Sequence, residues 1–444
     1  MSELHSVEEA RDAVLAAIPA RNAVERRATS DALGLVLAEP IVSQTTLPPW
    51  DNSAMDGYAI RSADVHGAAD ERPILLRVIG EVRAGAPALS AVEAGTAIRI
   101  ATGAPIPPGA DAVVQVELTT PADAAGLATG PRGRDATGAP PPTVLVHAAI
   151  EPGAAIRRRG SDLAEGITIL EAGQALSAPG VALASGAGIS HAQVYPRPRV
   201  AVLATGDEIV SAGEALGPAG IPDANGPGIA ALVEAAGGAS TRLGIARDRL
   251  DDVLAHLTTA LADEPDAIIV SGGVSVGPYD VVRTAFEQVG TIEMWKVAVQ
   301  PGKPFVFGTA IPTPGGKTTL LFGLPGNPVS SFVTFELFVR PAIRRLAGRR
   351  DVLRATDRAV LGDDVSKSAG RRAFVRVTAE RDASGAPVRD ERGRVRVRLS
   401  GGAAGQGSHV MSALVTADAL AVIPEAHDTL TAGAEVELWW LDPA

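Results

Sequence analysis

The chain has 444 residues, 46% of them hydrophobic and 20% charged, and its formal net charge is −11 at pH 7. This length suggests roughly three or four domains, because a single hydrophobic core does not grow so large. The negative charge and an aromatic content of 3% disfavour nucleic acid as a partner. The chain has no cysteine, which excludes disulfides, thiolate metal sites and cysteine nucleophiles. Because it shows neither a signal-peptide pattern at its start nor an apolar stretch of membrane-spanning length, we expect a cytoplasmic protein without a membrane partner.

The first regular element that we expect is a helix beginning after Ser6. Ser6 and Glu9 have the spacing of a capping box, in which each residue bonds the backbone N–H of the other. Apolar residues then recur at helical intervals as far as Ile18, and Pro19 is expected to stop the helix.

A region rich in β-strands is expected next. Between residues 47 and 117, short apolar runs alternate with glycine and proline, which predicts several short strands. Residues 121–142 show no periodicity and are expected to form a flexible surface loop. A connecting region with several glycine turns follows at 151–191.

From Arg199 onwards, strands alternate with helices. Residues 267–270 are a continuous apolar run, as expected for a strand buried on both faces of a parallel sheet. Asp248 is suited to cap the helix that follows it. The alternation predicts a doubly wound α/β domain, with strands at 200–203, 267–270, 305–307 and 320–322 and helices at 228–236, after Asp248 and at 329–346.

Three polar loops that contain glycine follow apolar strands of this predicted domain. In open α/β sheets, ligands bind beyond the carboxyl ends of the strands, so the loops 205–208, 271–280 and 324–328 form the candidate site. A glycine after a strand usually only turns the chain, but three such loops in one domain favour a crevice for phosphate and magnesium. The groups that would bind them are glycine amides, serine hydroxyls and carboxylates, at Ser271, Gly272, Gly273, Ser275, Gly277, Asp207, Glu208 and Asp280.

After residue 352 the pattern returns to strands. Three arginines alternate with apolar residues between Arg394 and Leu399, which predicts a half-buried strand with arginines on its solvent-exposed face. We interpret this strand as a solvated edge of a sheet and not as a nucleic-acid-binding surface.

Eight motifs, taken in order along the chain, are similar to those of one enzyme family. The chain resembles the molybdopterin molybdenumtransferases, the MoeA family, which includes the gephyrin E domain. The similarity covers nearly the whole chain except residues 121–142, and the ordered set is specific although each motif alone is not. The motifs are PPWDNSAMDGYA from Pro48, RIATGAPIPPGADAVVQVE from Arg99, RRRGSD from Arg157, TGDEI from Thr205, SGGVSVGPYD from Ser271, PGKP from Pro301, LPGNPVSSF from Leu324 and GQGSHVMSAL from Gly405.

The resemblance implies an enzyme that consumes adenylylated molybdopterin and molybdate, releases AMP and yields molybdenum cofactor in a magnesium-dependent reaction. It also implies an elongated homodimer with active clefts between protomers, and the molybdopterin adenylyltransferase as a further partner. Four domains are expected in each chain: a helical/linker domain at 1–46 and 152–195, a β-rich domain at 47–151 that contains the DNSAMDGYA motif, a molybdopterin-binding α/β domain at 196–346 and a C-terminal β-barrel at 347–444.

Carried over position by position, the resemblance implies a catalytic set of Asp56, Thr102, Glu208, Asp248 and Asp280. The expected magnesium ligands among these are Asp56, Glu208 and Asp280. Two alternatives stay open, namely that Asp248 is only a helix cap and that Asp162 only pairs with neighbouring arginines. The residues expected to bind the substrates are Asp162, Ser271, Gly272, Gly273, Ser275, Lys303, Pro325, Pro328, Ser330 and Ser408, with Arg371 or Arg372 as a further cation for molybdate.

One position departs from the family pattern. Members of the family often have lysine before the motif that begins at Pro301, whereas this chain has Gln300, which we expect to be a tolerated variant. Two other functions stay in competition, a non-catalytic dimeric scaffold of the gephyrin type and a molybdopterin adenylyltransferase, which shares the SGG-type domain. The carboxylates at 56, 208 and 280 favour catalysis over a scaffold, and the DNSAMDGYA unit and the C-terminal barrel argue against the adenylyltransferase.

Overall fold

A computed structural model of the protein describes residues 4–19, 23–134, 138–274, 281–311, 316–402 and 405–441, except for the side chain of Trp295. The chain divides into two compact units, which are described separately. The first contains Met1–Glu39, Ala172–Ser177 and Ala192–Ala444, and the second contains Pro40–Glu171 and Ala178–His191. Within the described residues, no helix has the length and apolar character needed to cross a bilayer.

The first unit is built on a six-stranded sheet in the order β17-β14-β18-β22-β21-β19. Its first four strands are parallel, whereas β21 and β19 run antiparallel to their neighbours. β21 and β22 are consecutive along the chain, and antiparallel neighbours need only a short connection between them, whereas a parallel pair needs a long crossover. The strands are β14 (Arg199–Thr205), β17 (Ala239–Ala246), β18 (Ala267–Ser271), β19 (Thr291–Lys296), β21 (Pro304–Ala310) and β22 (Thr319–Leu324).

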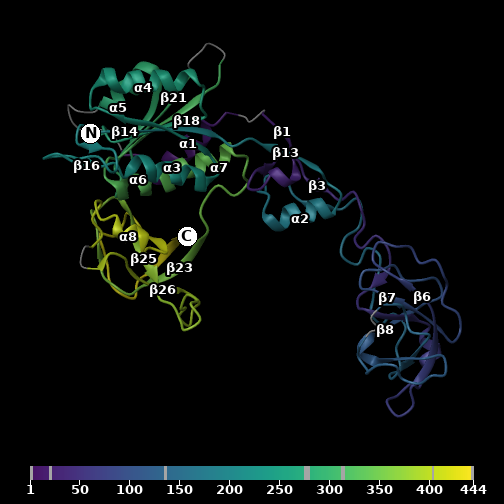
Figure 1. Cartoon of the computed structure of the whole chain (residues 1–444). Helices are drawn as coiled ribbons and strands as arrows, with labels where there is room; N and C mark the ends of the chain where they lie inside the picture. Colours follow the sequence, from purple (N-terminus) through teal and green to yellow (C-terminus); the bar gives the residue numbers. More distant parts are fainter. Residues whose placement is uncertain are drawn as a thin grey trace. The chain divides into compact units, whose positions relative to one another are not determined.

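Alternate residues of these strands enter two separate cores, one on each face of the sheet. In β18, Ala267 and Ile269 belong to one core, and Ile268 and Val270 belong to the other. Helices α4 (Leu250–Ala262) and α5 (Val281–Val289) cover one face, as Figure 1 shows. The other face is covered by α1 (Val7–Ala16), α3 (Asn225–Ala236), α6 (Pro328–Thr334), η4 (Phe335–Val339) and α7 (Arg340–Leu346). The predicted doubly wound domain is therefore confirmed.

The ends of several helices test the predictions made from local sequence. Ser6 and Glu9 form the predicted capping box of α1, and α3 ends at Gly237, whose φ of 97° lies in the left-handed region. The prediction that Asp248 caps α4 is wrong, because the N-cap is Arg249 and no side chain caps this helix. The predicted helix 329–346 is continuous, but η4 is a π-helical segment within it.

A closed β-barrel forms the C-terminal part of the first unit. Its strands pair in the order β25-β26-β23-β29-β27, and β27 pairs again with β25 to close the barrel, while β20 (Val299–Gln300) adds to β25. Small apolar side chains such as Ala373, Val375 and Val377 fill the inside. The barrel strands are β23 (Thr356–Leu361), β25 (Arg372–Ala379), β26 (Val395–Leu399), β27 (Ala419–Ile423) and β29 (Glu435–Trp440).

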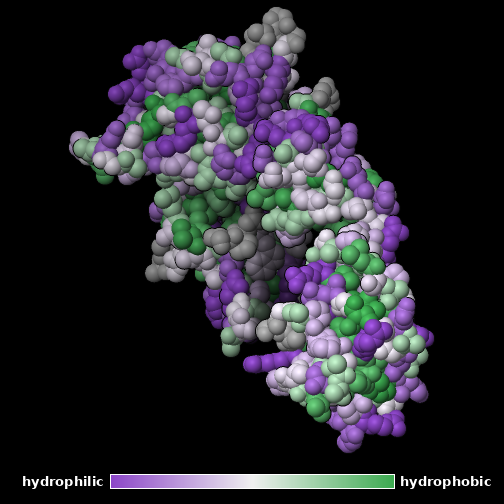
Figure 2. Space-filling view, turned by 45° about the vertical axis from the view of Figure 1, so that its right-hand side comes forward, coloured by the Kyte–Doolittle hydropathy of each residue, from purple (hydrophilic) through white to green (hydrophobic). Residues whose placement is uncertain are grey.

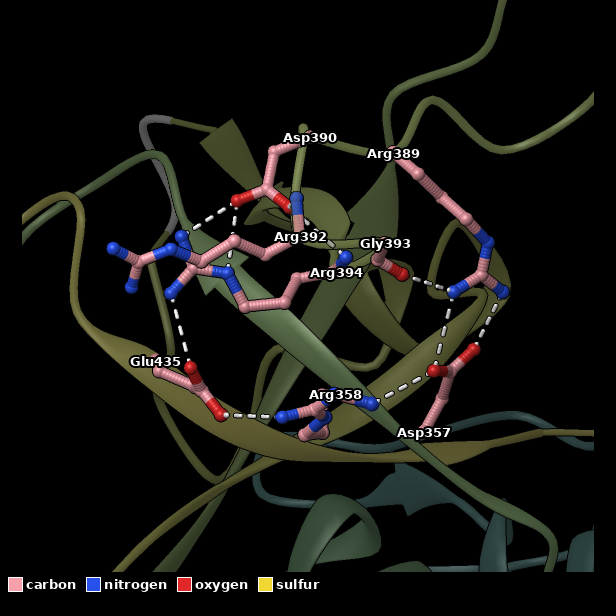
Figure 3. A network of polar contacts seen from close by, with 8 residues as sticks. All are labelled: Asp357, Arg358, Arg389, Asp390, Arg392, Gly393, Arg394 and Glu435. Carbon is pink, nitrogen blue, oxygen red and sulfur yellow. Dashed lines mark hydrogen bonds and ion pairs between the residues drawn. The ribbon is translucent and has the colours of Figure 1, made fainter.

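The arginine-rich strand lies inside this barrel wall and not at an edge, so that part of the prediction is wrong. β26 pairs with β25 on one side and with β23 on the other, and its arginines do face outwards as predicted. Figure 3 shows that the arginines around it are paired with acids: Arg394 bonds Asp390 and Glu435, and Arg389 bonds Asp357. The pKa of Asp390 falls to about 2, mainly because of its bond to Arg394. This pairing leaves little excess positive charge for a nucleic acid.

The second unit is mostly β-structure, as predicted. Its six-stranded sheet has the order β8-β5-β7-β6-β10-β9. The unit also contains two short strand pairs, β11-β4 and β12-β3, and helix α2 (Ala178–Gly186). The sheet strands are β5 (Gly57–Ile60), β6 (Ile74–Val82), β7 (Thr96–Ile100), β8 (Ala112–Gln115), β9 (Thr119–Ala122) and β10 (Thr143–Val146). The short strands are β3 (Ile41–Val42), β4 (Asn52–Ser53), β11 (Ile156–Arg157) and β12 (Thr168–Leu170).

The predicted loop at 121–142 begins later than expected. Pro121 lies in strand β9, where it pairs with Val144 of β10, so the irregular segment starts after Ala122. Proline is compatible with this position because β9 is an edge strand of its sheet.

The remaining elements are short, and the surface is mixed in character. On the face shown in Figure 2, hydrophobic residues, some of them in small groups, lie among hydrophilic ones, as is normal for the surface of a globular protein. The short elements of the first unit are β1 (Glu25–Ala28), β2 (Val36–Leu37), β13 (His191–Tyr195), β15 (Ile209–Val210), β16 (Ile221–Pro222), β24 (Val365–Ser366), β28 (Thr429–Leu430) and α8 (Ser412–Val415).

A buried ionic cluster connects the π-helical segment to the start of the barrel. Glu336 of η4 is 2% exposed, and both of its carboxylate oxygens accept from the guanidinium of Arg354, at 2.8 and 3.1 Å. Arg340, also buried, lies 3.6 Å from the same carboxylate. Removing the charge of Glu336 would leave two buried guanidinium groups without their shared carboxylate.

We predict that Glu336→Gln lowers the free energy of unfolding of the first unit by about 3–5 kcal/mol, the usual effect of removing one partner from a buried ion pair. The matched control is Glu287→Gln, since Glu287 forms an exposed pair with Arg283 at the same i,i+4 spacing. The control should change stability by no more than about 1 kcal/mol. Chemical denaturation followed by circular dichroism measures both variants, and equal effects would contradict the assignment.

Candidate functional site

A cavity of about 630 Å³ lies at the carboxyl ends of β14, β18 and β22. The loops that leave these strands form its wall, as the predicted topology requires. Its wall also includes the start of α3 and residues His409 and Met411 of the C-terminal part. The structure brings eight of the predicted site residues together here: Glu208, Asp248, Ser271, Gly272, Gly273, Pro325, Pro328 and Ser330.

A hydrogen bond between two loops holds the carboxylate of Asp248 at this cavity. The hydroxyl of Thr205 donates to Oδ1 of Asp248 at 2.9 Å, which joins the end of β14 to the segment before α4. Asp248 therefore has a position in the cavity wall instead of the capping role considered for it. Gly272 has a φ of 99°, and a Cβ there would collide with the carbonyl oxygen of Thr205. Only glycine lets these two backbones approach so closely.

Ser271 is the centre of a buried hydrogen-bond network at the end of β18. Its hydroxyl accepts from Nδ2 of Asn225 at 2.8 Å and donates to the carbonyl of Pro325 at 3.3 Å. Asn225 also donates to the carbonyl of Gly326 at 2.7 Å, and the hydroxyl of Ser331 donates to that of Pro325. The predicted serine thus fixes the loop 324–328 as well as facing the cavity.

Sequence reasoning missed two polar residues at the N-terminus of α3. Asn225 lines the cavity, and so does Asp223, which is only 5% exposed. Oδ1 of Asp223 accepts from the backbone N–H of Gly226 at 2.8 Å, and its other oxygen pairs with Arg242 at 3.4 Å. The signal available was an Asp and an Asn at the start of an apolar helix, the residue types that bond the free N–H groups there.

The acidic side chains at the cavity are few. Glu208 is exposed, and its carboxylate has no hydrogen bond or ion pair with any residue that the structure describes. Over the described ranges, no group of three or more acidic or histidine side chains is close enough to hold a metal ion. The predicted residues Ser275 and Asp280 lie outside the described residues, as does Gly277.

A second cavity, of about 590 Å³, lies between the sheet and the barrel and shares Pro304 and Ser330 with the first. It contains the predicted anion-binding residues Lys303, Ser330 and Ser408. The hydroxyl of Ser408 accepts from Nδ2 of Asn327 at 3.2 Å, which connects it to the loop at the first cavity.

The structure distinguishes between the two arginines considered for this anion. Arg371 lines the second cavity, together with Lys367, which sequence reasoning missed. Arg372 is instead occupied by two carboxylates, one from Glu8 of α1 and one from Glu425 at 3.0 Å. Arg371 is therefore the better candidate.

Gln300 also lies in the wall of the second cavity. Its side-chain oxygen accepts a hydrogen bond from the backbone N–H of Ser368 at 3.0 Å. A lysine could not accept this bond, since its ammonium group has only donors. In this chain the residue therefore holds the segment around Ser368 and adds no charge.

The remaining predicted site residues belong to the second unit. Oδ1 of Asp56 accepts from the backbone N–H of Thr102 at 2.6 Å and from its hydroxyl at 2.8 Å. These two bonds hold the pKa of Asp56 below its ordinary value, and the bond from the backbone N–H has the larger effect. Asp162 is exposed and forms no ion pair with the described residues, whereas Asp51 pairs with Arg158 at 2.6 Å. The ion-pair alternative for Asp162 is thus not supported.

Comparisons with known proteins identify relatives along the whole chain. Three family models match, "MoeA N-terminal region (domain I and II)" at residues 5–188, "Probable molybdopterin binding domain" at 201–345 and "MoeA C-terminal region (domain IV)" at 358–441. Molybdopterin molybdenumtransferase 2 of Mycobacterium tuberculosis is 36% identical over 92% of this chain and 93% of its own length. The molybdopterin molybdenumtransferase of Haemophilus influenzae is 32% identical over 98% of each chain.

A solved structure agrees with these sequence matches. The molybdopterin biosynthesis moeA protein of Pyrococcus horikoshii aligns with a TM-score of 0.74 and 28% sequence identity. The alignment covers 99% of this chain and 100% of that protein. The likeness therefore extends over all the parts described above.

We predict that Thr102→Val raises the pKa of Asp56 towards its ordinary value, because the hydroxyl donor is lost while the backbone donor remains. Since the folded-state pKa lies below the unfolded one, the two bonds stabilise the second unit at neutral pH, and this stabilisation is lost as pH falls through the folded pKa. The variant should therefore lose stability at neutral pH and show a weaker dependence on acid.

Carboxyl-carbon NMR titration measures this pKa, and acid unfolding measures the linked stability. Thr129→Val is the control, because its hydroxyl has no hydrogen bond with the described residues of the same unit. An Asp56 pKa that is the same in both variants would show that the Thr102 hydroxyl does not act on Asp56.

Proposed function

The chain belongs to the MoeA family, and from this premise we propose that it is a molybdopterin molybdenumtransferase. It would take adenylylated molybdopterin and molybdate as substrates, insert molybdenum, and release AMP. A transferase activity agrees with the names of the relatives in Mycobacterium tuberculosis and Haemophilus influenzae.

The observation that carries this proposal is the pair of adjoining cavities in the first unit. The first has glycine amides, serine hydroxyls and the N-terminus of α3 in its wall, groups that suit phosphate oxygens. The second has three cations, Lys303, Lys367 and Arg371, and four serines in its wall, groups that suit a tetrahedral dianion. Pro304 and Ser330 belong to both walls, so an organic substrate and an oxyanion would be held next to each other.

We assign the following tasks to the side chains. Glu208 and Asp248 would position water and the phosphoanhydride that is cleaved, and Asp56 with Thr102 and Asp280 would complete the catalytic set. Ser271, Gly272, Gly273, Pro325 and Pro328 would shape the site for the pterin phosphate, with Asp162 and Ser275 as further contacts. Lys303, Ser330, Arg371 and Ser408 would hold molybdate through charge-assisted hydrogen bonds.

Magnesium is proposed as the metal ion of the reaction. The carboxylate of Glu208, which none of the described residues pairs with, fits it, because Mg²⁺ prefers oxygen ligands and commonly takes one or two carboxylates together with substrate phosphates and water. Asp56 and Asp280 are the other proposed ligands. When bound, the ion would neutralise negative charge that develops on the phosphates.

We predict that Glu208→Gln lowers the rate of AMP release by at least about tenfold, the loss expected when a group acting in the transition state is removed. The test incubates the protein with adenylylated molybdopterin, magnesium and molybdate and measures AMP by chromatography. Glu214→Gln is the control, since Glu214 is an exposed acid nearby that does not line the cavity.

The same assay tests the whole proposal. If the unaltered protein releases no AMP, a non-catalytic scaffold becomes the better-supported function. AMP release that is equal in Glu208→Gln and in the unaltered protein would remove Glu208 from the catalytic set and from the magnesium site.

A homodimer and a cytoplasmic location belong to this proposal as well, on the resemblance to the family. We predict that light scattering on the purified protein gives a mass of about twice that of the 45.2-kDa chain, independent of dilution in the micromolar range. A mass equal to one chain at those concentrations would contradict the dimer.

A further inference from the structure

Arg376 of β25 is a buried cation without a carboxylate partner. It is 1% exposed and is the largest of the fully buried side chains. Its Nε donates to Oε1 of Gln406 at 3.2 Å, and its Nη1 donates to the carbonyl of Gly407 at 3.1 Å. Both acceptors are neutral, and no acid among the described residues forms an ion pair with it. The buried arginines at 340 and 354, by contrast, share the carboxylate of Glu336.

The partners of Arg376 belong to the segment 405–408, which lies in the wall of the second cavity. Gln406 accepts from the backbone N–H of Arg376 at 2.9 Å and donates to its carbonyl at 3.0 Å. It also donates to the carbonyl of Ser400 at 2.7 Å. Gln406, Gly407 and Ser408 all line the cavity. The hydrogen bonds of Arg376 thus fix the segment 405–408, which carries Ser408, whose hydroxyl is proposed to bind molybdate.

The charge of Arg376 lies next to the same cavity, because its hydrogen-bond partners Gln406 and Gly407 belong to the cavity wall. An arginine stays protonated even where burial lowers its pKa, as it does here. A buried charge is unfavourable unless an opposite charge compensates it, and the partners of this guanidinium among the described residues are two carbonyl dipoles. The charged groups lining the cavity are Lys303, Lys367 and Arg371 against one acid, Asp364. An anion in the cavity would therefore compensate a charge that the fold leaves unpaired.

We infer that Arg376 is a positioning residue that makes the second cavity selective for a small oxyanion, through its charge and through its hold on the segment 405–408. The identification of that oxyanion as molybdate rests on the proposed function. The preference for a compact, doubly charged anion does not, since it follows from the burial of Arg376 and from the lining charges.

Binding of molybdate to the full-length protein, without the organic substrate, tests this inference by calorimetric titration. Arg376→Met removes the charge and keeps an apolar side chain of similar length, and Arg376→Lys keeps the charge but loses the planar fork. Arg396→Met is the control, because Arg396 lies on the exposed face of the same barrel and pairs with Glu380 at 3.3 Å. Sulfate is titrated in parallel as a tetrahedral dianion that is not a substrate.

We expect Arg376→Met to weaken the binding of both anions by about tenfold or more, and Arg376→Lys to weaken it by less than about threefold. The loss in Arg376→Met should shrink as ionic strength rises, because part of it is electrostatic. In turnover, the KM for molybdate should rise while kcat stays within about twofold. Arg396→Met should match the unaltered protein in every measurement.

A folded Arg376→Met that binds both anions with unaltered affinity would overturn the inference, and so would equal losses in the Met and Lys variants. If Arg376→Met does not fold, Arg376→Gln takes its place, since it removes the charge and retains N–H donors for the carbonyl of Gly407. The same loss of anion affinity is then expected of Arg376→Gln, and unaltered affinity would overturn the inference. Failure of the proposed function has a different outcome: the unaltered protein would then bind sulfate and molybdate alike but release no AMP.

Discussion

The parallel core of the central sheet is the constraint on which the rest of the first unit depends. Because β17, β14, β18 and β22 run in one direction, their carboxyl ends lie at one edge, and the loops that leave β14, β18 and β22 must meet there. Alternate residues of the same strands pack into two cores, which fixes helices on both faces. Displacing a loop at that edge would disturb close-packed side chains on one face or the other. The position of the first cavity is therefore a consequence of strand direction.

Charge is distributed in three different ways in this unit, and each has a different effect. On the outside of the barrel, arginines and acids form partly exposed pairs that contribute little stability each and cancel one another's field. Around Glu336 the pairs are buried, so removing one member leaves charge uncompensated. The wall of the second cavity has an excess of positive charge from Lys303, Lys367 and Arg371. The buried Arg376 adds to it through its contacts with the lining residues 406 and 407. Only this third arrangement can attract a small anion.

Particular residues show how far local sequence reasoning reached. The capping box at Ser6 and the end of α3 at Gly237 were predictable, because each depends on a few neighbouring residues. The role of Asp248 was not, because its partner Thr205 is distant in the sequence and reaches it only through the pairing of strands. The same holds for Asn225, which connects Ser271 to Gly326. The choice of Arg371 over Arg372 depended on Glu8, which is contributed by the N-terminal helix.

The sequence by itself determined the alternation of strands and helices, the polar glycine loops after the strands, and the ordered motifs that relate the chain to its family. These features depend on periodicity and on residue types at fixed spacing, which a linear sequence contains. The tertiary structure decided which residues meet. Ser330 lines both cavities, Gln300 bonds the backbone of Ser368, and Arg376 bonds the carbonyl of Gly407. The tertiary structure also decided which charges are compensated. Compensation depends on distances and burial between residues far apart in the chain, and strand register sets those quantities only after the sheet and the barrel have formed.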